Sequence, residues 1–270
     1  MAETSRGSGR KRARVEVIDA DACAGAGAGE TLGLEHDLTF SDTLIALQMM
    51  REQFPIVEKV VVQPFILRSQ LYSSVKDRTQ VDRDLESLKK DKILRVFKLN
   101  TGQDDHAIMF MDDYLRQMEI AVKRLEIPNK LDLEIFEWFK AYVVDSKLDV
   151  SIHHQELFSL LSYGGDVTDK HVTLLINAGL LTRQLIDPNM YWFAIPNIGS
   201  IWKSLSQGRK EILSFLKRTK YKEMMLAAFE KKRLRFSPLD MRFHLRDLIG
   251  SGHLKTVQTP TGLLVRLSRD

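Results

Sequence analysis

The chain has 270 residues, with 40 Lys and Arg, 36 Asp and Glu, and one cysteine. A single cysteine excludes an intrachain disulfide and a cysteine-based zinc site, and no stretch approaches the roughly 20 apolar residues of a membrane-spanning helix. The formal net charge of +4 hides two basic blocks: residues 203–235 carry +8, residues 1–15 carry +4, and the remainder is acidic. We therefore expect a soluble intracellular protein with localised attraction for a polyanion.

Residues 1–37 are rich in Gly, Ala, Ser and charged side chains. Such a composition buries too little apolar surface to offset the entropy of ordering the chain, so we predict a disordered tail. Its basic cluster, comprising Arg10, Lys11, Arg12 and Arg14, is typical of a nuclear import signal, although solvated tails also contain short basic clusters. The cluster favours a nuclear location.

After residue 37, a helix followed by a β-hairpin is predicted three times. The helices cover residues 81–90, 170–178 and 239–249, and the hairpins turn at residues 100–105, 187–189 and 260–262. Further helices are predicted at residues 42–54, 67–74, 131–144 and 155–162. Two or three helices followed by a hairpin describe a winged helix. The sequence therefore predicts a mainly α fold with small β-hairpin wings: three tandem winged-helix domains at residues 38–127, 128–198 and 199–270.

The ends of the three helices before the hairpins also correspond. Gly179 and Gly252 are placed where a left-handed residue would end a helix. Thr79, Thr168 and the pair Ser237-Pro238 are predicted N-terminal caps.

The third predicted domain holds the basic block. Residues 202–216 form an amphipathic helix on which Lys203, Lys210 and Lys217 recur every seven residues, and a second helix is predicted at 221–229. A solvated helix face, or favourable cations at a helix C-terminus, is the alternative reading, but only three acids interrupt the block. We expect the block to bind double-stranded DNA through phosphates, with little sequence preference and steep salt dependence. The predicted DNA-binding residues are Lys203, Arg209, Lys210, Lys217, Arg218, Lys220, Lys222, Lys232 and Arg233.

Two further arginines, Arg242 and Arg246, could reach a DNA groove from the last predicted helix. Asp240 and Asp247 nearby favour local pairing instead.

Motifs for catalysis are missing from the sequence. It has no phosphate-binding GxxxxGK[ST] loop, HExxH, CxxC pair or GxSxG elbow, and the glycines, lysine and triplets of a protein kinase do not occur in order. His153 and His154 precede a helix, where a cap or surface role is favoured over metal binding. We expect no catalytic residues, metal or cofactor.

Several segments resemble the serine/threonine-protein kinase 19 family. They are Pro64–Tyr72, Asp77–Thr79, Asn177–Thr182, Gly208–Glu223 and His244–Gly250, and in order the resemblance covers about residues 41–267. It implies a nuclear protein of three winged helices that binds double-stranded DNA in transcription-coupled nucleotide excision repair. It also implies self-association, and bridging of the stalled RNA polymerase II complex, the Cockayne-syndrome ubiquitin-ligase receptor and the TFIIH helicase. Seven of the nine predicted DNA-binding residues match its DNA-contacting positions; Lys210 and Lys222 come from the charge pattern alone.

Two other functions stay open from the sequence. One is an atypical serine/threonine protein kinase. The other is a winged-helix subunit of the transcription machinery whose DNA contact is incidental.

Overall fold

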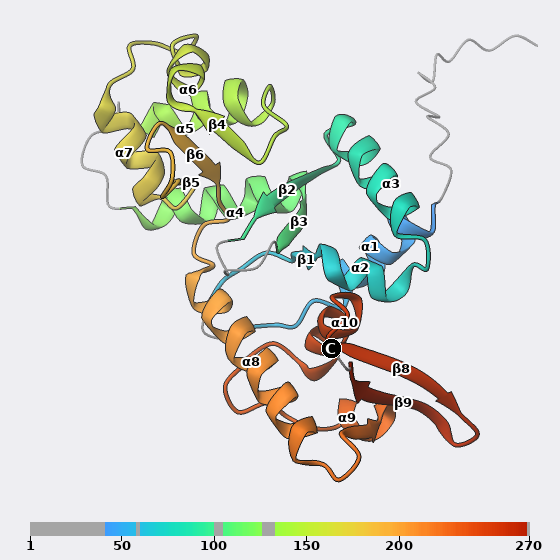
Figure 1. Ribbon diagram of the computed structural model, residues 1–270. Coiled ribbons are helices and arrows are strands. Elements are labelled where there is room, and N and C mark those ends of the chain that lie inside the picture. Colours follow the sequence, from blue (N-terminus) through green and yellow to red (C-terminus); the bar gives the residue numbers. More distant parts are fainter. Residues whose placement is uncertain (1–40, 58–59, 100–104, 126–132, 269–270) are drawn as a thin grey trace, which may run out of the picture. The chain divides into compact units, whose positions relative to one another are not determined.

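A computed structural model describes residues 41–57, 60–99, 105–125 and 133–268 (Figure 1). These residues belong to one compact unit, Thr39–Asp270. The predicted tail, with Arg10, Lys11, Arg12 and Arg14, lies outside the described residues, as does most of the predicted turn at 100–105.

Three successive repeats share one order of elements: helix, strand, two helices and two strands. The first contains α1 (Asp42–Glu52), β1 (Ile66–Leu67), α2 (Arg68–Ser74), α3 (Arg78–Lys90), β2 (Leu94–Lys98) and β3 (His106–Phe110). The second contains α5 (Glu134–Trp138) with a π-helix (Phe139–Val144), β4 (Ser151–His153), α6 (His154–Leu161), α7 (Asp169–Asn177), β5 (Leu181–Arg183) and β6 (Met190–Phe193). The third contains α8 (Gly199–Arg218), β7 (Glu223–Met225), α9 (Leu226–Glu230), α10 (Met241–Gly250), β8 (Leu254–Thr259) and β9 (Gly262–Leu267). The helix α4 (Met111–Arg124) follows the first repeat and was not predicted.

Each repeat has a three-stranded antiparallel sheet in which the last strand is central. The strand orders are β1-β3-β2, β4-β6-β5 and β7-β9-β8. The three predicted hairpins are confirmed, and the element order is consistent with a winged helix. The first strand of each sheet is only two or three residues long, too short to produce an alternating pattern in the sequence.

The junction between the last helix and the hairpin is left-handed in all three repeats. The φ angles are 76° at Gly179 and 83° at Gly252, which confirms the two predicted glycine positions. Lys92 occupies the same place in the first repeat with φ of 56° despite its Cβ. A shared backbone turn therefore begins each hairpin.

Two of the three predicted helix caps were wrong. Thr168 caps α7 as expected, whereas α3 is capped by Asp77, whose carboxylate accepts hydrogen bonds from the N–H groups of Thr79 (2.9 Å) and Gln80 (3.2 Å). Likewise α10 begins after Asp240, which accepts from the Phe243 N–H at 2.7 Å, and not at Ser237-Pro238. In both places a carboxylate close to the predicted position satisfies the free N–H groups of the first turn.

The predicted helix at residues 221–229 was also wrong. Residues 223–225 form β7, which pairs with β9, and only residues 226–230 are helical. Pairing with a distant strand overrides the local helical pattern here.

The hydrophobic cores of the repeats are joined. Phe54 and Phe65 of the first repeat pack edge-to-face on Phe243 of the third, and Phe65 also packs on Trp202, with ring centroids 5.1–6.0 Å apart. The largest buried cluster contains residues of all three repeats. The predicted domain boundaries therefore stay predictions.

Helix α10 lies directly against α2 of the first repeat (Figure 1). The amide of Gln70 donates to the Phe243 carbonyl at 2.9 Å. A Cβ at Gly250 would lie 1.6 Å from the Ser69 carbonyl oxygen. Only glycine permits this approach of the two backbones.

We predict that Gly250→Ala destabilises the protein by at least about 1–3 kcal/mol, because the backbones must separate. The matched control is Gly199→Ala in α8, where a Cβ meets no atom within 4 Å and helix propensity improves. Urea unfolding followed by circular dichroism measures both. Equal stability of the two variants would contradict the close contact.

Candidate nucleic-acid interface

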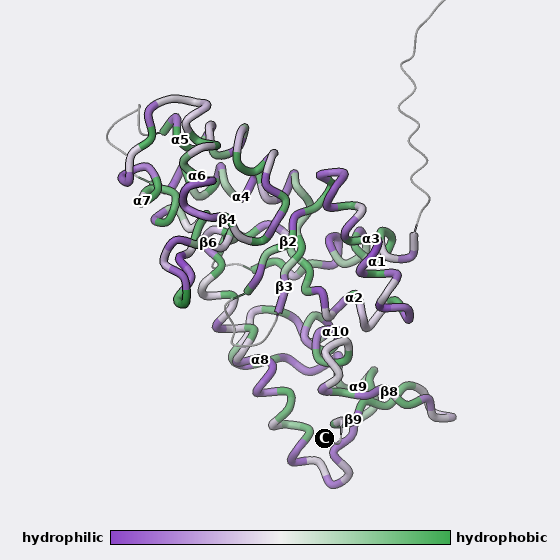
Figure 2. The backbone as a smooth tube through the Cα atoms, turned by 45° about the horizontal axis from the view of Figure 1, so that its top comes forward, coloured by the Kyte–Doolittle hydropathy of each residue, from purple (hydrophilic) through white to green (hydrophobic). Residues whose placement is uncertain are grey.

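Helix α8 carries the first part of the basic block and is amphipathic, as predicted. Its apolar stripe is buried, with Ile201, Leu205, Ile212 and Leu216 each at most 1% exposed. Figure 2 shows hydrophobic and hydrophilic stretches alternating along its length. Packing of this stripe fixes which basic side chains face solvent.

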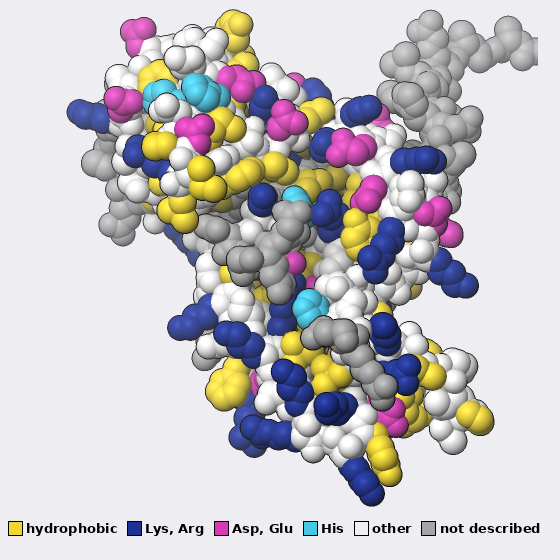
Figure 3. Space-filling view, in the orientation of Figure 1, with side chains coloured by type: hydrophobic (Ala, Val, Ile, Leu, Met, Phe, Trp, Pro, Cys, Tyr) yellow, Lys and Arg dark blue, Asp and Glu magenta, His cyan; other side chains and the backbone are white. Residues whose placement is uncertain are grey.

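The third repeat presents Lys and Arg side chains with few acids between them. In Figure 3 dark blue side chains gather in the lower part of the view, over α8 and the hairpin β8–β9, whereas acidic side chains are more frequent above. The uneven charge of the sequence is therefore also uneven in space.

Arg209, a predicted DNA-binding residue, is instead held in a nearly buried ion pair. Its guanidinium contacts Asp247 of α10 at 2.6 Å and Asp105, just before β3, at 2.7 Å. Asp247 is fully buried and also accepts from the Ser69 hydroxyl at 2.6 Å. Burial lowers the pKa of Arg209, but the bonds and charges of the two carboxylates outweigh this and raise it. Arg209 therefore joins the first and third repeats and is not directed at a phosphate.

The arginines of α10 are also engaged within the protein. Arg246 donates to the Gln53 side chain at 2.7 Å, and Arg242 lies 3.6 Å from Glu230. The pairing expected with Asp240 and Asp247 is therefore not the one formed. With α10 covered by α2 as well, the helix that enters a DNA groove in many winged helices is not free to do so.

Most of the remaining basic side chains of the block line two grooves beside the end of α8. The first, here called the wing groove, has a volume of about 1270 Å³ and runs between α8, the start of β7 and the hairpin β8–β9. Its basic lining residues are Lys217, Lys220, Lys222, His253, Lys255 and Arg266.

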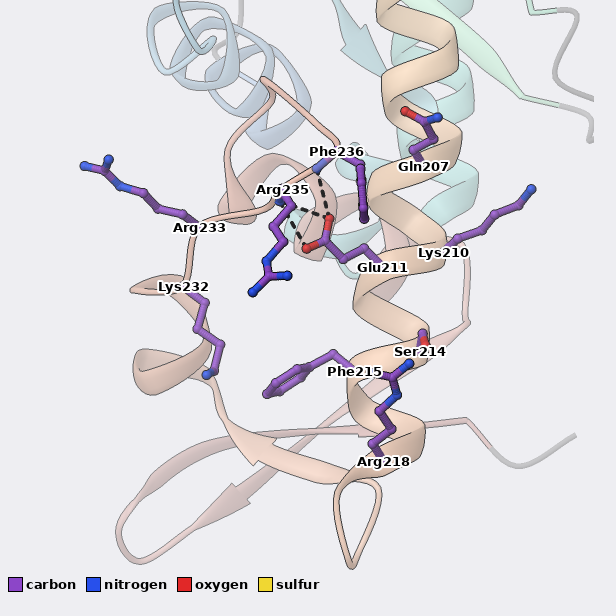
Figure 4. Close-up of a pocket in the computed structure, with 10 residues that line it drawn as sticks. All are labelled: Gln207, Lys210, Glu211, Ser214, Phe215, Arg218, Lys232, Arg233, Arg235 and Phe236. Carbon is purple, nitrogen blue, oxygen red and sulfur yellow. Dashed lines mark hydrogen bonds between the residues drawn. The ribbon is translucent and has the colours of Figure 1, made fainter.

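The second, here called the helix groove, has a volume of about 760 Å³ and lies between α8 and residues 232–236 (Figure 4). Its basic lining residues are Lys210, Arg218, Lys232, Arg233 and Arg235.

The predicted residues are thus brought together in two sets. Lys217, Lys220 and Lys222 line the wing groove, while Lys210, Arg218, Lys232 and Arg233 line the helix groove. Lys203 is exposed on α8 and lines neither groove. The predicted row of lysines therefore does not face one ligand surface.

Two basic residues of the wing groove were missed by the sequence analysis. Lys255 on β8 and Arg266 on β9 are cross-strand partners and both are exposed. Each is an isolated cation in the sequence, so only the hairpin register reveals the pair. In the part of the chain that the structure describes, neither they nor Lys217, Lys220 and Lys222 form a salt bridge.

The paired histidines are structural. His153 caps α6 by accepting from the Gln155 N–H at 3.2 Å, which confirms the predicted cap. His154 lies 3.0 Å from the Tyr191 hydroxyl. Among the described residues, no group of three His, Cys, Asp or Glu side chains is placed to hold a metal ion, and no helix could cross a membrane.

Residues 32–267 match the model of the family described as inactive serine-threonine protein kinase 19. The chain belongs to this family. Its relatives include several proteins named winged helix repair factor 1. The human protein is 31% identical over 76% of this chain and 76% of its own length, and the Xenopus laevis protein is 34% identical over 76% and 75%. The Dictyostelium discoideum protein is 29% identical over 86% of this chain and 66% of its own length. The kinase 19 family is described as inactive, in keeping with the missing kinase motifs.

We predict that Arg209→Met destabilises the protein by about 3–5 kcal/mol, because the carboxylate of Asp247 is left buried without its countercharge. The matched control is Lys210→Met, which removes an exposed charge at the next position of α8. Chemical unfolding of both variants measures the difference. If Arg209→Met were as stable as Lys210→Met, the structural role of Arg209 would be contradicted.

A second prediction concerns His244, which is buried with its Nε2 2.8 Å from the Ser237 hydroxyl. Burial and the charge of Arg209, opposed by Glu211, lower its pKa from 6.5 to about 4. The unfolded chain therefore takes up this proton at higher pH than the folded protein. The stability that depends on neutral His244 is complete above about pH 6.5 and is lost as the pH falls toward about 4.

We expect the free energy of unfolding of His244→Gln to fall less than that of the wild type over this range. Urea unfolding at about pH 7 and about pH 4.5 measures, for each protein, how far the free energy of unfolding falls between the two pH values. Parallel losses in the two proteins would contradict the lowered pKa.

Proposed function

We propose that this protein is a non-enzymatic, double-stranded-DNA-binding factor of DNA repair, and that the wing groove is its duplex site. The observation that carries the proposal is the set of exposed cations at the end of α8 and on the hairpin, which have no salt-bridge partners among the described residues. Among the residues that the structure describes, Glu223 is the one acid in the lining. The names of the relatives support the connection to repair.

Recognition by the wing groove would depend on phosphates. Its cations are mostly lysines, which supply charge without the fixed geometry that reads base edges. Because α10 is covered by α2, the helix that enters the major groove in many winged helices is not free to do so in the third repeat. Binding with little sequence preference follows, as the charge pattern alone also predicts.

The family resemblance supports a more specific role. We propose action in transcription-coupled nucleotide excision repair in the nucleus, as an adaptor between the stalled RNA polymerase II complex, the Cockayne-syndrome ubiquitin-ligase receptor and the TFIIH helicase. The outward faces of α3 and α7 mix acids and bases, which suits them to protein contact more than to phosphate. The same resemblance favours self-association.

We predict that the triple variant Lys217→Glu, Lys220→Glu, Lys222→Glu loses at least roughly ten-fold in affinity for duplex DNA, with a shallower dependence on salt. The reason is the loss of phosphate contacts and the repulsion that replaces them. Fluorescence anisotropy with a duplex of unrelated sequence, at several salt concentrations, measures both quantities.

The matched control changes the same net charge elsewhere: Arg83→Glu, Lys90→Glu, Lys170→Glu, on exposed positions of α3 and α7. It should bind duplex DNA nearly as the wild type does. Equal losses in the two triple variants would mean that overall charge, and not the wing groove, governs binding.

A further inference from the structure

The helix groove has a different chemistry from the wing groove. Figure 4 shows Lys232 and Arg235 pointing into the space between α8 and residues 232–236, with Phe215 pointing across it from α8. Arg233 points away from this space, and Arg218 lies at its lower end. Cations and aromatic rings are therefore interleaved in one hollow.

Glu211, the single acid among the described residues that line this groove, is hydrogen-bonded within the protein. The carboxylate of Glu211 accepts hydrogen bonds from the backbone N–H groups of Arg235, at 3.1 Å to each oxygen, and of Phe236, at 3.2 Å. These bonds hold residues 235–236 against α8 and offset the negative charge of Glu211. An anionic ligand would therefore meet a wall that is already positioned and positively charged.

Two phenylalanines supply the apolar surface of the groove. Phe215 packs against Phe229 with ring centroids 5.5 Å apart. The Lys232 ammonium lies 4.6 Å from the centroid of the Phe215 ring. Phe236 is 62% exposed at the groove margin. An exposed ring in a groove that Lys232 and Arg235 enter suits a ligand that presents both negative charge and flat apolar faces.

We propose that the helix groove binds single-stranded nucleic acid, with an unpaired base against Phe236 and phosphates on Lys232 and Arg235. Each nucleotide of a single strand offers a phosphate and an accessible base face, and the combination of basic groove and aromatic side chain is characteristic of such sites. The bases of a duplex are stacked on one another and offer no face to Phe236. An acidic peptide offers negative charge, but its residues do not each carry a ring that could lie against Phe236.

The position of the groove extends the proposed function. The end of α8 separates the helix groove from the wing groove, and a helix with its side chains is about 10–12 Å across. A duplex in one groove and the strand that leaves it in the other would be bound together at a junction. The inference goes beyond duplex binding and can fail without affecting it.

The test compares Phe236→Ala with the wild type on an oligothymidylate of about 15 nucleotides, an oligouridylate of the same length and a blunt duplex. Fluorescence anisotropy should show a loss of roughly five-fold or more for a single strand, while duplex affinity changes less than about two-fold. A loss on either single strand supports the proposal, and the two probes tell which sugar is bound. Phe236→Trp should restore binding.

Two controls keep the result interpretable. Ile186→Ala removes another exposed apolar side chain, 97% exposed in the second repeat, and should change nothing. The triple variant of the wing groove should lose duplex affinity and keep most of its affinity for single strands.

Three outcomes would overturn the proposal. One is unchanged single-strand affinity in Phe236→Ala. Another is an equal loss on single strand and duplex, which would make the helix groove part of the duplex site. The third is that Phe236→Ala weakens the binding of a labelled acidic peptide but does not weaken the binding of oligonucleotides.

Discussion

One nearly buried guanidinium determines which surfaces of the third repeat stay free. Arg209 of α8 holds Asp247 of α10 and Asp105 of the first repeat, and Asp247 is bonded to Ser69 of α2 as well. Charges in such a place are stabilising only when all of them are paired, so the four side chains form one constraint. It keeps α10 against α2, where Gly250 lets the backbones touch.

This constraint explains why the repeats present different charged surfaces although they share an order of elements. In the first two repeats, the helix before the hairpin is exposed along one side, but its charges are mixed or few. In the third, that helix is covered, and the free cations lie on α8, the hairpin and residues 232–235. Charge and geometry thus favour the margins of the third repeat for the proposed nucleic-acid contact, since phosphates could be reached there without entering a groove.

Much of the fold could be predicted because its signals are local. Turn residues and β-branched strands gave the three hairpins, and Gly179 and Gly252 marked two of the three left-handed junctions. The segment 223–225 could not be predicted, because it becomes a strand only by pairing with β9. Predicted caps failed where an aspartate stood close by. Local pattern does not show which of two neighbouring polar side chains reaches the helix.

The sequence predicted many of the residues that belong to the candidate site, but not how they are arranged. The arrangement depends on contacts between residues that are far apart in the chain. Arg209 looks like its neighbours in the basic block, yet its partners are 38 and 104 residues away in the chain. Lys255 and Arg266 become neighbours only through the register of β8 and β9. Adjacent residues also separate, since Lys217 and Arg218 line different grooves. A helix places successive side chains about 100° apart, so a single run of basic residues supplies two surfaces. Which ligand each surface suits then depends on what lies beside it: a hairpin with further cations on one side, and the aromatic rings of Phe215 and Phe236 on the other.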